Sequence, residues 1–470
     1  MTINDILSSI EAGKMTARQA VEAALKKADE TSEYAALLSL TSERALNRAD
    51  EIDAKLEKGE DAGRLAGVPF VAKDNFLAFG APTTAASKML ENFKAPLQAT
   101  AVEKLEQAGA ICIGKANLDA FAHGGSTENS AFGPTSNAHD KTRVAGGSSG
   151  GSAVATALDV VPFTLGSDTG GSIRQPASFN GVIGVKPTYG TVSRYGVVAM
   201  ASSTDTVGCF AKSVDDAELV MEIMSGRDDK DMTTLGDVMD SAKAVKPVKK
   251  IGVISDFMNG DVDNEVLKIT EAYVEKMKAA GYEVEPVSMP IIKHSLAMYY
   301  IIVPAEVSSN LARYDGVRYG HRAEGIKTLA ELYGKSRDEG FVTENKRRIM
   351  IGSYVLSSGY FDAYYMKAQK ARTKLIDKYK QLFESYDLLV SPTAPTPAFK
   401  LGATGDDPVQ MYLADAMVVG PSLAGLPAIS VPAGDTPDGL PVGVQLIGWR
   451  ETDRSLFAVA RKVEEVANDN

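Results

Sequence analysis

Cysteine is scarce in this chain: 470 residues hold only Cys112 and Cys209, each in or beside an apolar segment. So few cysteines exclude a disulfide framework. No apolar run reaches the length of a membrane span, and no charged-then-apolar leader opens the chain. We therefore expect a cytoplasmic protein without membrane contact.

Basic residues are also fewer than acidic ones, so the formal net charge is −11 and the sequence pI is about 5.1. A nucleic-acid backbone is held by a basic patch, so we expect any RNA to be held by a partner. Hydrophobic residues make up 44% of the chain, enough for a large core. The residues of the site proposed below lie far apart in the sequence, which favours one domain over residues 1–470.

Two glycine-dense loops dominate the middle of the chain, at residues 146–152 and 166–172. They flank an apolar stretch long enough for one short helix and one strand, so the loops should lie side by side. Glycine allows positive φ and close backbone approach to a ligand. Neither loop is a P-loop, because no Lys-Ser or Lys-Thr follows.

The hydroxyls in these loops are candidates for a nucleophile, and two arrangements can activate one. Gly146 to Gly150 fits the G-x-S-x-G elbow, with His294 or His321 as its base, although the polar stretch 137–143 stands where the elbow needs a buried strand. The alternative base is Lys73, which ends an apolar run; burial would lower its pKa and leave a neutral amine. Acyl transfer then needs no histidine, with Ser148 as relay and Ser172 as nucleophile.

Strand and helix patterns alternate along most of the chain, which predicts an α/β fold with a covered sheet. Residues 2 to about 60 are expected to be helical, within an N-terminal packing layer over 1–65, and Thr16 can cap the second helix. Residues 226–250 should form a connection. A mainly helical region over about 290–385 should end in a long helix from Phe361 to about Phe383, with Tyr364, Ala368, Ala371, Leu375, Tyr379 and Leu382 on its inner side.

The stretch around Lys73 and the two glycine loops resemble the signature of the amidase family, and Ser148 and Ser172 have the family's spacing. The resemblance implies a mixed, mostly parallel sheet covered by helices on both faces, and a triad of Lys73, Ser148 and Ser172. It also implies a cis peptide bond between Gly147 and Ser148. We expect the backbone N–H groups of Thr169, Gly170, Gly171 and Ser172 to form an oxyanion hole.

Further stretches, at residues 125–135, 186–190, 347–350 and 357–360, resemble the glutamine-hydrolysing subunits of tRNA-dependent amidotransferases. That branch of the family implies glutamine as substrate, with Arg348 for the α-carboxylate, Asp415 for the α-amino group, and Tyr299 or Tyr300 in the same pocket. A stand-alone amidase acting on small aliphatic or aryl amides is the alternative.

The same resemblance implies a heterotrimer with amidotransferase B and C subunits. Ammonia would pass to the B subunit, which would hold the Glu-tRNA(Gln) or Asp-tRNA(Asn) and use ATP and Mg²⁺. This chain would need no cofactor or metal of its own.

The sequence departs mildly from the family pattern at Ala145, Asn180 and His123. None of these departures removes a chemical group that the mechanism uses. His123 is expected to be a hydrogen-bonded structural histidine close to the pocket.

Overall fold

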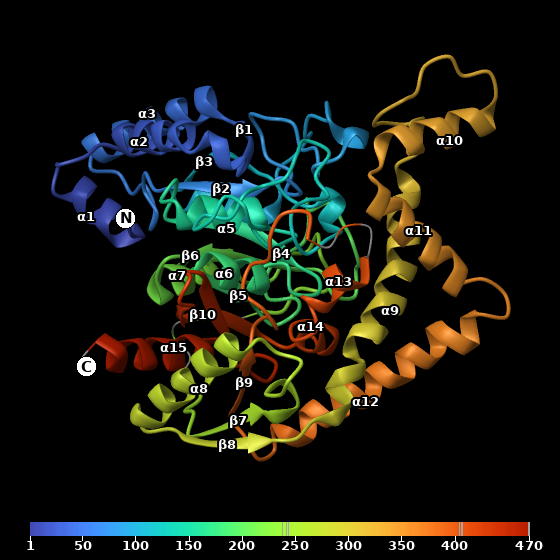
Figure 1. Cartoon of the computed structure of the whole chain (residues 1–470). Helices are drawn as coiled ribbons and strands as arrows, with labels where there is room; N and C mark the ends of the chain where they lie inside the picture. The colour runs from blue at the N-terminus through green and yellow to red at the C-terminus, as the bar shows by residue number, and fades with distance from the viewer. Residues whose placement is uncertain (237, 241, 243, 404, 406–407, 469–470) are drawn as a thin grey trace.

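An eleven-stranded mixed sheet forms the centre of the computed structural model (Figure 1), which describes residues 1–236, 238–240, 242, 244–403, 405 and 408–468. The strand order is β1-β3-β2-β4-β6-β5-β10-β11-β9-β7-β8. The strands are β1 Leu37–Leu40, β2 Pro69–Lys73, β3 Ile111–Ala116, β4 Phe163–Asp168, β5 Ile183–Lys186, β6 Thr206–Ala211, β7 Lys250–Ile254, β8 Glu283–Val287, β9 Leu388–Pro392, β10 Ala428–Asp435 and β11 Pro441–Ile447.

The α/β class and the mixed sheet are confirmed, but the expectation of mostly parallel pairing is wrong. Parallel pairs join β3, β2 and β4 near one edge of the sheet, and β9, β7 and β8 at the other. The strands between them, from β4 to β9, pair antiparallel throughout. One cause is local, since β10 and β11 are joined by a turn too short for a parallel crossover.

Helices cover both faces of the sheet, as expected. Neighbouring residues of a strand point to opposite faces, and in β2 Phe70 packs in one apolar cluster while Val71 packs in another. The helices are α1 Ile3–Glu11, α2 Ala17–Glu30, α3 Ser42–Glu57, α4 Thr100–Gln107, α5 Gly150–Ala157, α6 Arg174–Asn180, α7 Val214–Met224, α8 Asn264–Ala279, α9 Ser295–Asn310, α10 Leu329–Gly340, α11 Thr343–Val355, α12 Lys367–Leu382, α13 Pro408–Leu413, α14 Val419–Ala424 and α15 Asp453–Asn468.

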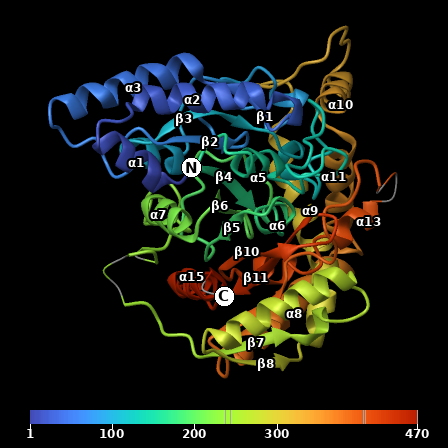
Figure 2. The ribbon, with the colours of Figure 1, turned by 60° about the vertical axis from the view of Figure 1, so that its left-hand side comes forward.

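The N-terminal layer contains a strand that the sequence analysis missed. Helices α2 and α3 lie side by side over the β1–β3 side of the sheet (Figures 1 and 2), whereas Ile3 and Ile6 of α1 pack in the apolar cluster that contains Phe70. Thr16 caps α2 with a capping box, as expected. Between α2 and α3, however, β1 pairs antiparallel with β3. Four residues of this kind cannot be told from part of a helix by periodicity alone.

The helical region after β8 runs along one side of the molecule as α9, α10, α11 and α12 (Figure 1). Helix α11 packs directly on α9, since a Cβ at Gly352 would collide with the carbonyl of Pro304. The expected long helix begins with a π-helical turn, Phe361–Met366, and continues as α12. Tyr364, expected on the inner side, is exposed, because the π-helical turn breaks the 3.6-residue period used to place it.

The segment expected to be a connection has no regular helix or strand among its described residues from 226 to 249, and residues 237, 241 and 243 lie outside the description. In the described part of the chain, no helix combines the length and apolar character that crossing a bilayer requires.

Candidate active site

Lys73 is the last residue of β2 and is completely buried. Its Nζ lies 2.8 Å from Ser148 Oγ and 3.0 Å from Ser167 Oγ, so the amine contacts a hydroxyl from each glycine loop. Strands β2 and β4 are parallel neighbours, which brings their carboxyl ends, and hence these side chains, to the same edge of the sheet.

Burial changes the protonation of this amine. Loss of water around the ammonium lowers the pKa of Lys73 to about 7, although the carboxylates of Asp119, Asp168 and Asp205 act in the opposite direction. About half of the molecules would hold a neutral amine at pH 7, against well under 1% at the ordinary lysine pKa. The amine can therefore accept a proton.

Ser148 lies in the first glycine loop, just before α5, and is fully buried. The Gly147–Ser148 peptide bond is cis, as the family resemblance implied. Gly147 has no room for a side chain, because a Cβ there would collide with the Asp119 carboxylate. The Gly147 N–H donates to Gln175 Oε1 at 3.0 Å, which ties this loop to the helix that follows the second loop.

Ser172 lies in the second glycine loop, between β4 and α6. Its carbonyl accepts a hydrogen bond from the N–H of Ser149 at 3.2 Å, so the two loops are in direct contact. The Ser172 side chain is 8% exposed, and among the described residues its hydroxyl has no hydrogen-bond partner. The hydroxyl is thus free to meet a substrate.

A buried ion pair holds the second loop in shape. Asp168 accepts two hydrogen bonds from the guanidinium of Arg174, at 3.0 and 2.9 Å, and both side chains are fully buried. Burial by itself raises the pKa of Asp168, but Arg174 outweighs it and lowers the pKa to about 2. The carboxylate is therefore charged at every physiological pH, and it also accepts the N–H groups of Gly171 and Ile173.

That last contact corrects one expectation about the oxyanion hole. The Gly171 N–H donates to Asp168 Oδ1 at 2.8 Å, so it is occupied within the protein. The other expected donors are the N–H groups of Thr169, Gly170 and Ser172. Gly170 lies under an aromatic ring, because a Cβ at this position would come within 2.5 Å of the Tyr299 ring.

Helices α9 and α11 bring a cation to the same region. Arg348, on α11, is 2% exposed; its Nε donates to Glu344 at 2.7 Å, and its guanidinium lies 4.6 Å from the Tyr300 ring centre and 5.1 Å from that of Tyr412. Its Nη1 has no partner among the described residues. Tyr299 lies against the nucleophile loop and Tyr300 lies against Arg348. Both tyrosines that the sequence analysis considered for the glutamine pocket are therefore at this site.

Asp415 supplies a carboxyl group close to the nucleophile loop. A Cβ at Gly125 would lie 3.5 Å from both carboxylate oxygens of Asp415, and one at Gly171 would lie 3.6 Å from Oδ1. No donor within the described ranges hydrogen-bonds this carboxylate, and burial raises its pKa well above the ordinary value, against the pull of Arg348. The site therefore holds a buried cation and a buried carboxylate, each with unused hydrogen-bonding capacity.

The histidine-dependent alternative finds no support. His321 hydrogen-bonds Glu339 at 2.6 Å, and His294 is exposed at the end of a 3₁₀ turn. Neither contacts Ser148, and the segment before that serine contains no strand, which a nucleophile elbow requires.

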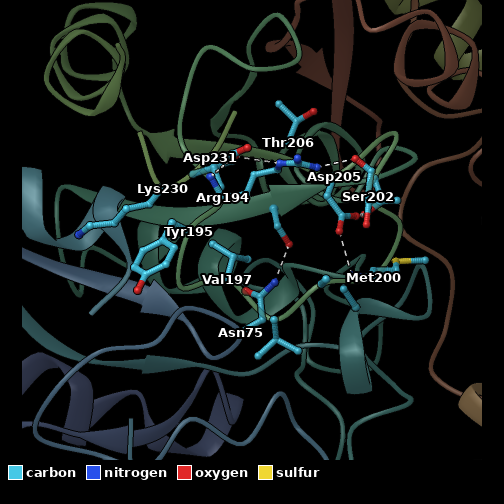
Figure 3. Close-up of a pocket in the computed structure, with 16 residues that line it drawn as sticks. Asn75, Arg194, Tyr195, Val197, Met200, Ser202, Asp205, Thr206, Lys230 and Asp231 are labelled. Carbon is cyan, nitrogen blue, oxygen red and sulfur yellow. Dashed lines mark hydrogen bonds and ion pairs between the residues drawn. The ribbon is translucent and has the colours of Figure 1, made fainter. Parts of the chain in front are cut away.

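A cavity of about 200 Å³ adjoins the residues that hold Lys73 (Figure 3). Asn75, Ser167 and Thr169 are among its lining residues, and Arg194 and Asp231 form an ion pair in its wall. Tyr299, Arg348 and Asp415 do not line it. The cavity is therefore lined by Thr169 of the expected oxyanion hole but not by the residues expected to bind the ends of glutamine.

The sequence analysis missed several residues that position Lys73 and Arg348. Ser167 contacts the amine of Lys73 directly, and Asn75 holds Ser167 in place, because Asn75 Nδ2 donates to Ser167 Oγ at 3.0 Å. The sequence could have predicted both residues at the site, because each lies at the carboxyl end of one of two neighbouring strands. Glu344, which binds Arg348, also had a local signal, because it lies four residues before Arg348 on α11. Tyr412 had none, because α13 meets α11 only in the folded chain.

A buried lysine, a serine in contact with it and a second serine on an adjoining glycine loop, all on an α/β sheet, define a class of serine hydrolase that works without histidine. The family model described as Amidase matches residues 19–457, and the chain belongs to the amidase family.

Individual relatives indicate a particular branch of this family. The A subunit of the glutamyl-tRNA(Gln) amidotransferase of Koribacter versatilis is 50% identical over 469 residues, covering 99% of this chain and 98% of that protein. The crystal structure of the same amidotransferase component from Thermotoga maritima has a TM-score of 0.81 at 40% identity, covering 99% of this chain and 94% of that one. A bacterial aryl acylamidase of the amidase signature family has a TM-score of 0.86 at 25% identity, with 99% and 96% covered.

Proposed function

We propose that this chain is the glutamine-hydrolysing subunit of a tRNA-dependent amidotransferase. The observation that carries the proposal is that Arg348, a buried cation, and Asp415, a buried carboxyl group, both lie at the site beside the nucleophile loop. Each has atoms free to hydrogen-bond a ligand. Free glutamine ends in an ammonium and a carboxylate, so it needs both charges. The identity to several proteins that bear this name supports the same assignment.

The chemistry is hydrolysis of a side-chain amide. Ser172 Oγ attacks the amide carbon while its proton passes to Ser148, whose hydroxyl accepts one proton and donates its own to the neutral amine of Lys73. The C–N bond then breaks as the proton returns through the same relay to the leaving nitrogen, which departs as ammonia. Water attacks the resulting ester by the same route and releases glutamate.

The developing negative oxygen lies against the backbone N–H groups of Thr169, Gly170 and Ser172. One donor of this kind is worth about 3 kcal/mol in the transition state. The ion pair of Asp168 with Arg174 keeps this backbone in position, because it anchors the loop from inside the protein.

The released ammonia would be used by other subunits. We infer that B and C subunits complete a heterotrimer in the cytoplasm, that the B subunit holds Glu-tRNA(Gln) or Asp-tRNA(Asn), and that it uses ATP and Mg²⁺, so that this chain needs no cofactor. The acidic charge of this chain, −11, agrees with tRNA contacts made elsewhere.

Substrate preference tests the proposal. Ammonia release from glutamine, asparagine, propionamide and acetanilide is measured with the purified chain alone and then with B and C subunits. Selectivity for glutamine, with activation by the partners, is expected. Partner-independent turnover of several unrelated amides would contradict it and favour the alternative, a stand-alone amidase, which the structural likeness to an aryl acylamidase keeps as second candidate.

A further inference from the structure

Three buried polar atoms without a partner in the described structure occur together near the proposed glutamine site. They are His123 Nε2, Asn345 Oδ1 and Arg348 Nη1. A buried polar atom left unpaired is costly, and folded proteins contain few of them. Three in one place indicate a ligand that pairs with them.

The three side chains form one connected group. Asn345 and Arg348 lie three residues apart on α11, so they share a face of that helix. The Asn345 amide nitrogen lies 2.8 Å from the carbonyl of Ala120 and 3.0 Å from His123 Nδ1, which joins α11 to the loop that carries the histidine. All three side chains are at most 2% exposed.

The loop of His123 also reaches the carboxylate side of the site. Two residues further on, Gly125 lies against Asp415, with 3.5 Å from an added Cβ to each carboxylate oxygen. On the other side, the charge of Arg348 acts on His123 directly, since burial and Arg348 together lower the pKa of the histidine to about 3. His123 is therefore a neutral imidazole, and the loop that carries it also contacts Asp415 through Gly125.

The hydrogen bonds decide where the single proton of that imidazole is. Two groups contact Nδ1 of His123: Asn345 Nδ2, which can only donate, at 3.0 Å, and the carbonyl of Ala120, which can only accept, at 3.3 Å. The contact with Asn345 is the shorter one, and the Ala120 carbonyl already accepts from Asn345 Nδ2 at 2.8 Å, so we assign Nδ1 as the acceptor. A neutral ring with an accepting Nδ1 carries its proton on Nε2, the atom that has no partner. His123 thus offers a neutral N–H donor, and Asn345 links it to the helix that carries the free Nη1 of Arg348.

We propose that His123 is a substrate-binding residue, whose Nε2–H binds the α-carboxylate of the amino-acid substrate together with Nη1 of Arg348. This inference rests on the proposed function, because it takes free glutamine as the ligand. Asn345 is a positioning residue that sets the proton of His123, and its own Oδ1 accepts from the ammonium end of the same ligand.

The test compares glutamine with 4-aminobutanamide, which is glutamine without its α-carboxylate. The measured quantity is the ratio of kcat/KM for the two amides. His123→Met removes the donor at similar side-chain size, and His123→Gln is the matched control because its amide nitrogen reaches the position of Nε2. A hydrogen bond to a charged group is worth a factor of about ten to a hundred.

We expect His123→Met to raise the KM for glutamine by about that factor with kcat nearly unchanged, and to leave 4-aminobutanamide unaffected. His123→Gln should keep most of the preference. A preference equal to wild type in His123→Met, or an equal loss for both amides, would overturn the inference. Thermal unfolding checks that each variant folds.

Should His123→Met not fold, Asn345→Leu is measured in the same way. It removes the group that sets the histidine proton, so the preference for glutamine should fall, and an unchanged preference would again overturn the inference. Failure of the proposed function is distinguishable from both results, because the wild-type chain itself would then show no preference for glutamine.

Discussion

The protonation of Lys73 should control the rate between pH 5 and pH 8. Only the neutral amine can accept the proton of Ser172 through Ser148, and burial lowers its pKa from 10.5 to about 7. The sign is therefore fixed, because the neutral, active form grows as pH rises. Taking that value, about nine tenths of the amine is neutral at pH 8 and about 1% at pH 5, so kcat/KM for glutamine should fall by about a hundredfold. Ammonia release at low glutamine concentration, measured in a series of buffers, gives the profile.

Asp119 titrates in the same window and needs a control. It is buried with a pKa raised to about 6, it accepts backbone N–H groups from Thr127 and Asn129, and its charge raises the pKa of Lys73. In Asp119→Asn the acid limb should therefore persist and move to lower pH. Disappearance of the limb in this variant, or a wild-type profile that is flat from pH 5 to pH 8, would refute the role given to Lys73.

Three further substitutions, one of them with a control substitution elsewhere, test the surroundings of the triad. Ser167→Ala removes the hydroxyl that holds Lys73, so kcat for glutamine should fall by about tenfold without a change in KM; a wild-type kcat would contradict this. Gly170→Ala should abolish most turnover, because the new Cβ meets an aromatic ring, whereas Gly334→Ala on the open face of α10 should keep activity and raise stability by up to about 1 kcal/mol; equal activities would be the contrary result. Asp415→Asn keeps the shape but not the charge, so the KM for glutamine should rise by about tenfold or more with a smaller effect on kcat, and an unchanged KM would remove this residue from the site.

The sequence predicted the parts of the fold that depend on local pattern. Helix α5 and strand β4 fill the apolar stretch between the two glycine loops, and Thr16 caps α2, as expected. Strand β1 was missed, because its pairing with β3 spans most of a hundred residues and leaves no periodic trace. The antiparallel centre of the sheet was missed for a similar reason, since apolar strands buried on both faces look alike in either direction.

For the site, the triad and the charged pair were predicted by resemblance, and the structure adds what no local pattern contains. Burial of Lys73 is a property of the folded core, so its lowered pKa could be expected but not shown from the sequence. The engagement of Gly171 by Asp168 follows from the shape of the loop. The partnership of His123 with Asn345 joins residues more than two hundred positions apart.

The identity of the nucleophile is tested most directly by trapping the covalent intermediate. The enzyme is mixed with glutamine, quenched in acid within milliseconds, digested and mapped by mass spectrometry. The mechanism predicts a γ-glutamyl ester that peptide fragmentation locates on Ser172 itself, lost in Ser172→Ala and kept at lower yield in Ser167→Ala. An ester on Ser148, or ammonia release by Ser172→Ala at the wild-type rate, would contradict the account.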